Sequence, residues 1–212
     1  MSGVAMQTPA STATDYAALQ FVFQQLLSKV YTIIVARVQA VTNDGALAPA
    51  GTVDVLPLVN QITSEGVAVP HNTVFKLPYV RVQGGANAVI MDPQVGDIGL
   101  VAIAMRDISV VKRTKAQGQP GSRRMFSPAD GLYIGGVLNG APTQYVQFTD
   151  DGVKVVSPTK VTIQAPAIEL DGPVTATSTI AASEDVTADG ISLHDHLHGE
   201  VSTGSDQTGP PE

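Results

Sequence analysis

Three closely spaced histidines in the C-terminal part of this sequence are the residues best suited to chemistry. They are His194, His196 and His198, each separated from the next by one residue. Residues i and i+2 of an extended strand face the same way, so alternate histidines can point at one axis. If three chains shared that axis, two inward imidazoles from each chain would supply roughly six nitrogen ligands, which suits an octahedral ion better than tetrahedral zinc. The spacing predicts a metal site between chains.

A solvated tail is one alternative interpretation of this motif, and a catalytic metal site is the other. Cupin metalloenzymes also contain two histidines separated by one residue, but they add a Glu a few residues later and a further His on a downstream strand. Only fourteen residues follow His198, and none of them is histidine. Elsewhere, the dispersed carboxylates Asp92, Asp97 and Asp107 lack a companion motif for acid/base catalysis, and Asp97 is expected to form a turn. We therefore expect no enzyme activity.

Composition limits how the chain can be stabilised. It has 212 residues, of which 43% are hydrophobic, and it has no cysteine, so disulfides and thiolate metal sites are excluded. All ten aromatic residues lie between Tyr16 and Phe148, which leaves the following segment without a large ring for a core. No signal peptide or bilayer-spanning apolar stretch is recognisable, and synthesis in the cytoplasm is expected.

The charge is distributed unevenly. Residues 143–212 contain eleven acidic residues but only Lys154 and Lys160 as basic ones. Such a surface repels phosphate backbones, so no nucleic-acid partner is expected. By contrast, the segment 112–129 contains five Lys and Arg residues with Gly and Pro, and predicts a long basic loop.

The first two regions of the chain have different patterns. In residues 1–36, apolar residues from Tyr16 to Val30 recur at helical spacing after possible capping residues at Thr12–Asp15, and predict one amphipathic helix. That helix packs on its own domain or docks on a neighbouring subunit. Residues 37–142 contain several short apolar runs separated by Gly, Pro and Asn, which favour a small β-barrel of the five-stranded OB type.

The third region, residues 143–193, has its own repeat. Apolar residues separated by one position recur about every six to eight residues. The pairs are Val153/Val155, Val161/Ile163, Ile168/Leu170, Val174/Ala176, Ile180/Ala182, Val186/Ala188 and Ile191/Leu193. Each pair predicts a very short strand with one inward face, and such a ribbon has no second layer to cover that face.

Other chains must therefore cover the apolar face of this ribbon. Three copies wound around a threefold axis would bury the pairs and pair the strand edges, which predicts an intertwined triple-stranded β-helix. A single-chain solenoid is the alternative, but about fifty residues would complete fewer than three of its coils. A disordered segment is the other alternative, against which the regular apolar pairs count.

The C-terminal motif and the middle region together resemble a known family. Leu193 to Val201, followed by Thr208-Gly209-Pro210, resembles the tip of the central spike in the baseplate of contractile-tailed bacteriophages. The segments Pro93–Leu100, Arg106–Ile108 and Arg123–Gly131 resemble the OB domain of the same proteins. The resemblance extends from about residue 37 to the end of the sequence.

The resemblance implies a mainly β homotrimer in the tail baseplate of a virion. Its OB domains (37–142) would attach to the tail hub, its β-helix (143–193) would form a shaft, and its apex (194–212) would hold one iron ion per trimer. Because the family motif places its two histidines directly before Gly, the implied ligands are His196 and His198, while a shifted register would use His194 and His196. The implied function is mechanical piercing of the host outer membrane during contraction.

Two other functions remain open from the sequence. A trimeric receptor- or glycan-binding tail adhesin would share the shaft, although carbohydrate sites usually use exposed aromatic residues and none follows Phe148. An OB-fold nucleic-acid binder is disfavoured by the sequence pI of about 4.9 and by the lack of interleaved aromatic and basic residues.

Overall fold

The protein is mainly β, with few helices, and divides into two compact units. The computed structural model describes residues 14–43, 47–63, 65–197 and 204. The first unit is Met1–Thr143 and the second is Gln144–Glu212. None of the helices in the described part of the chain is long and apolar enough to cross a bilayer.

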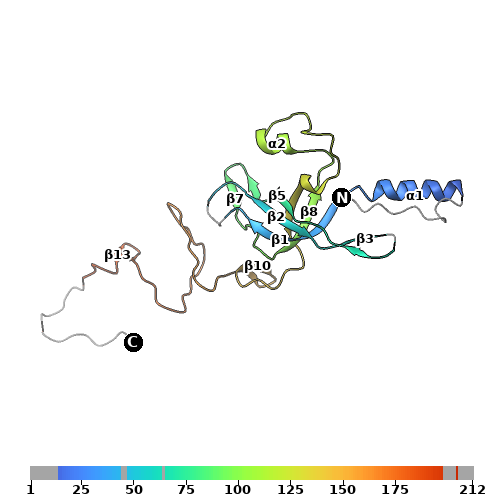
Figure 1. Cartoon of the computed structure of the whole chain (residues 1–212). Coiled ribbons are helices and arrows are strands. Elements are labelled where there is room, and N and C mark those ends of the chain that lie inside the picture. Colours follow the sequence, from blue (N-terminus) through green and yellow to red (C-terminus); the bar gives the residue numbers. More distant parts are fainter. Residues whose placement is uncertain (1–13, 44–46, 64, 198–203, 205–212) are drawn as a thin grey trace. The chain divides into compact units, whose positions relative to one another are not determined.

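The first unit begins with a helix and continues as a five-stranded antiparallel sheet (Figure 1). Helix α1 spans Asp15–Leu27, within the predicted helical segment, and Thr14 caps it by accepting a hydrogen bond from the Ala17 amide. The sheet has the order β5-β2-β1-β8-β9. Its strands are β1 (Ile33–Val41), β2 (Thr52–Pro57), β5 (Val74–Pro78), β8 (Ile98–Ile103) and β9 (Gly131–Gly136).

Two hairpins and two short helical segments complete this unit. The hairpins pair β3 (Gln61–Ile62) with β4 (Ala68–Val69), and β6 (Val82–Gly84) with β7 (Asn87–Val89). A tight turn at Gly85-Ala86 connects β6 to β7, with Gly85 at a φ of 57°. Helix α2 covers Ser109–Thr114, at the start of the predicted basic loop, and a 3-10 turn covers Pro128–Asp130.

The sheet curls until its two edge strands meet. Tyr79, just after β5, forms a parallel bridge with Tyr133 of β9, and the Val80 amide donates to the Tyr133 carbonyl at 2.8 Å. Irregular register in three strand pairs, for example between Val38 and Ala40 of β1, bends the strands and makes this closure possible. The curl encloses one hydrophobic core.

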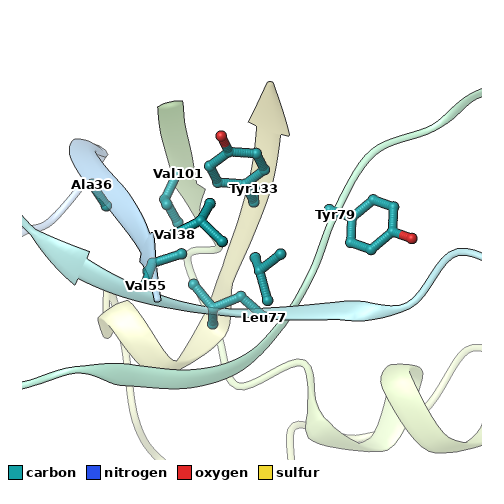
Figure 2. Packing of buried hydrophobic residues seen from close by; sticks show 8 residues of the cluster. Ala36, Val38, Val55, Leu77, Tyr79, Val101 and Tyr133 are labelled. Atoms are coloured by element: carbon teal, nitrogen blue, oxygen red, sulfur yellow. The ribbon is translucent and has the colours of Figure 1, made fainter. Parts of the chain in front are cut away.

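The core consists of alternate residues of these strands. In β2, Val53 and Val55 are fully buried while Asp54 between them is not, because successive side chains of a strand point to opposite faces. The complete cluster is Ala36, Val38, Val53, Val55, Leu77, Tyr79, Val101 and Tyr133. Figure 2 shows these side chains converging from several strands, with Tyr79 at the edge of the group. The first unit therefore contains a core of its own.

A buried ion pair stabilises one side of the first unit. Arg81 donates from Nη2 to both carboxylate oxygens of Asp92, at 2.7 and 2.9 Å, and from Nη1 to the Ala48 carbonyl at 2.6 Å. Both side chains are almost completely buried, and the hydrogen bond with Asp92 raises the pKa of Arg81. Asp97 forms a turn by accepting from the Gln94 amide at 2.8 Å, as the sequence predicted.

Two buried carboxylates hold the basic segment after α2. Asp130 binds Arg124 through two hydrogen bonds, of 2.6 and 2.9 Å, while Asp107 lies 3.2 Å from the same guanidinium. Asp107 also accepts from the Ser122 hydroxyl at 2.7 Å and from the Ser109 amide at 2.9 Å. These hydrogen bonds, that from Ser122 above all, lower the pKa of Asp107 to about 2.

We predict that this acidic cluster makes the first unit sensitive to acid. A carboxylate whose pKa is lower in the folded than in the unfolded state contributes stability at neutral pH, and that contribution is lost as pH falls through the folded pKa, here between about pH 4 and pH 2. Thermal unfolding followed across this range should show a decrease in melting temperature that Asp107→Asn weakens. Glu65→Gln, which changes an exposed carboxylate, is the control. Equal pH dependence of wild type and Asp107→Asn would contradict the prediction.

Candidate metal centre

A short hairpin directly precedes the three histidines. Strands β12 (Thr187–Ala188) and β13 (Ile191–Ser192) pair antiparallel, and the turn between them, Asp189-Gly190, has positive φ values of 50° and 80°. The Leu193 amide continues the hairpin by donating to the Val186 carbonyl at 2.9 Å. The hairpin thereby brings Asp185 and Ser192 together just before the first histidine.

Asp185 and Ser192 fix the backbone at the start of the histidine segment. The His194 amide donates to the Asp185 carboxylate at 3.2 Å and to the Ser192 hydroxyl at 3.1 Å. The Asp195 amide donates to the same hydroxyl at 2.8 Å. The hydrogen bond from Ser192, with several backbone amides, lowers the pKa of Asp185. An ionised Asp185 is therefore part of what orients this segment.

His194 and His196 do not lie on a strand within one chain. His194 is in a turn, where its Nδ1 lies 2.7 Å from Asp195 Oδ1 and both side chains are largely exposed. His196 follows the turn, also outside any strand, and His198 lies outside the described residues. The sequence predicted that alternate histidines of a strand point in the same direction. Within the single chain this does not apply to His194 and His196, because neither lies on a strand.

One chain alone does not assemble a metal site in the part that the structure describes. Within residues 14–43, 47–63, 65–197 and 204, no three His, Asp or Glu side chains form a group able to hold an ion. The donors themselves are suitable, because neutral imidazole is a good ligand for first-row transition metals. A site at this position would therefore need ligands from further copies of the chain.

Asp185 and Ser192, which orient this segment, were not among the site residues expected from the sequence. Asp185 and Ser192 are seven residues apart and meet only because a tight turn at Asp189-Gly190 lies between them. The available signal was the pair Asp189-Gly190, a dipeptide common in two-residue hairpin loops. Recognising that turn would have placed Asp185 opposite the start of the histidine segment.

Comparison with known proteins bears directly on this segment. Residues 190–212 match the family model described as the GpV Apex motif, which is the apex of the phage baseplate central spike. The C-terminal segment of the chain carries the apex motif of a phage baseplate spike protein. The matched region includes β13 and all three histidines, and the motif is a metal-binding tip motif of the spike. The spike protein therefore belongs to the tail baseplate of the virion. A search of curated proteins found no match for the chain.

Proposed function

We propose that three copies of this spike protein form the central spike of a contractile tail, attach to the tail hub, and pierce the host outer membrane mechanically. The observation that supports this proposal is the absence of a core in the second unit. No residue among the described part of 144–212 is buried. In the same structure, the first unit buries eight hydrophobic residues.

The exposed apolar side chains of the second unit include those of the repeated pairs. The nine Val, Ile and Leu side chains of the pairs from Val161 to Leu193 are between 43% and 74% exposed. In Figure 1 the trace between β11 (Gly152–Val156) and β12 carries no strand arrow, so its backbone also lacks intrachain ladder partners. Burial of apolar side chains and pairing of strand edges are both satisfied if three chains intertwine as a triple-stranded β-helix over 143–193.

The first unit is proposed to be the OB attachment domain, residues 37–142. The first strand of its sheet, β1, pairs with the second and the fourth, and the third, β5, meets the fifth, β9, in parallel. This connectivity is that of a five-stranded OB barrel and supports the assignment. The domain carries the basic segment after α2, whereas the second unit is strongly acidic, so the two units present different surfaces to partners.

At the tip, we assign metal binding to His196 and His198 from three chains. Six imidazoles on a threefold axis suit an octahedral ion, and iron, one per trimer, is the ion we propose. When bound, the ion would link the three chain ends. Within each chain, the hydrogen bonds of Asp185 and Ser192 hold the backbone that leads into the ligands. The role is structural, and no reaction is assigned to the protein.

We predict that charged residues at one apolar pair abolish the shaft. The double substitution Ile168→Asp with Leu170→Asp would bring carboxylates from three chains together at the axis, at a cost of several kcal/mol for each buried charge. Sedimentation should show loss of the trimer, and virions assembled with this variant should adsorb to cells without penetrating them. Glu169→Gln, which changes the residue between the pair, is the control. A double variant that remains a trimer would refute the proposal that the apolar pairs are buried at the axis of a trimeric shaft.

The metal assignment predicts a defined stoichiometry. Elemental analysis of the full chain should give about one iron per three chains, and His196→Ala with His198→Ala should remove it while the shaft stays trimeric. His194→Ala is the matched control and should retain the metal. Loss of metal in His194→Ala with retention in His198→Ala would instead indicate the shifted register.

If the first unit is the attachment domain, it should bind the baseplate without the second unit. Deleting residues 143–212 removes the acidic unit but leaves the core of the first unit complete. The truncated protein should still bind isolated baseplates, with binding weakened less than about tenfold, and the binding should decrease with salt if the basic segment contributes. A truncated protein that folds but does not bind would show that attachment requires the second unit.

A further inference from the structure

The second unit begins with a regular hairpin that has one apolar face. Strands β10 (Tyr145–Thr149) and β11 pair antiparallel, with Val146 opposite Val155 and Phe148 opposite Val153. Directly opposed residues of an antiparallel pair lie on the same face of the sheet. Four apolar side chains therefore share one face, which we call the hairpin face, and Gln147 and Lys154 lie opposite each other on the other face.

The hairpin face is uncovered in a single chain. Its four side chains are between 57% and 78% exposed, and Phe148 is the most exposed of them. An isolated two-stranded hairpin is only marginally stable in water and gains stability when such a face packs against another layer. The hairpin face therefore needs a partner as much as the repeated pairs do.

The shaft itself specifies its register poorly. Four of its aliphatic pairs, from Ile168/Leu170 to Val186/Ala188, recur every six residues, so over this stretch a chain displaced along the axis by one repeat still presents apolar residues inward. Three long chains that pair by such a repeat would form several misaligned arrangements of similar stability. Correct alignment requires a feature that does not recur along the shaft.

We propose that the hairpin face packs against the same face of two other copies and sets the register of the three chains before the shaft closes. This inference rests on the proposed trimer. Phe148 is the last aromatic residue of the chain, so its contact cannot be replaced by any later repeat. Once three Phe148 rings meet, every following pair is at the same height in all chains.

Two observations identify further copies of this chain as the occupant. Val153 and Val155 of the hairpin face are also the first of the repeated pairs, so the face continues directly into the residues that form the shaft. The hairpin face also carries no charge, while Lys154 lies on the opposite face. Three identical faces can therefore meet without repulsion between like charges.

The absence of cysteine in the chain allows a direct test of register. Ala182→Cys places one thiol per chain at a shaft position expected to face the axis, and disulfides between copies form only where the chains are aligned. The full-length protein is unfolded, refolded and then oxidised. Two quantities are measured: the fraction of cross-linked chains and the rate at which the trimer is recovered. Phe148→Ser in this background should slow recovery by about tenfold and reduce the cross-linked fraction, because an aromatic side chain loses its burial in each chain.

Matched variants separate register from general damage. Gln147→Ser, on the opposite face, should leave both readouts unchanged, and Phe148→Leu should restore most of the cross-linking. Normal recovery and cross-linking in Phe148→Ser would overturn the inference, and so would a variant whose only defect is weaker baseplate binding, which would identify a baseplate protein as the occupant. Failure of the wild-type chain to form a trimer would instead overturn the proposed function.

Discussion

None of the apolar side chains that the structure describes in the second unit is buried within one chain, and the proposed trimer follows from this constraint. From Val146 to Leu193 the chain repeatedly presents pairs of apolar residues, yet none of the described residues after Thr143 is buried. Polar and acidic residues between the pairs keep one side of the ribbon compatible with water. A chain of this kind gains its hydrophobic stabilisation only by association with others.

The first unit, by contrast, buries a cluster of apolar side chains within one chain. Its sheet curls so that β5 and β9 meet, and its core and both buried ionic clusters are complete within one chain. In the proposed trimer this unit would remain a rigid body linked to the hub, while the second unit acquires its structure from its neighbours. The proposed spike would require both properties to transmit force along its axis, and the division of the chain at Thr143 and Gln144 separates them.

The sequence predicted those parts of the fold that depend on local patterns. The helix after Thr14 and the turn at Asp97 were both predicted, because each is encoded within a few residues. The mainly β class and the spike resemblance at the C-terminus were also correct. The OB barrel, the trimeric shaft and the ligands His196 and His198 remain proposals.

Long-range polar contacts could not be predicted in the same way. Asp92 was expected only to lack a companion motif for acid/base catalysis, and its ion pair with Arg81 forms because the β6–β7 hairpin folds the chain back. Arg124 was counted as part of a basic loop, although Asp107 and Asp130 hold it. Near the histidines, the contact of Asp185 with the His194 amide depends on the turn at Asp189-Gly190. In each case an intervening turn or loop brings the partners together, and no repeating pattern connects them.

Sedimentation of the full-length chain at micromolar concentration, combined with hydrogen exchange over residues 144–193, tests whether three chains form the shaft together. The account predicts a particle of three chains in which the amides of the shaft exchange slowly, because their hydrogen bonds are made between copies. A folded single chain whose amides in 144–193 are protected from exchange would contradict it.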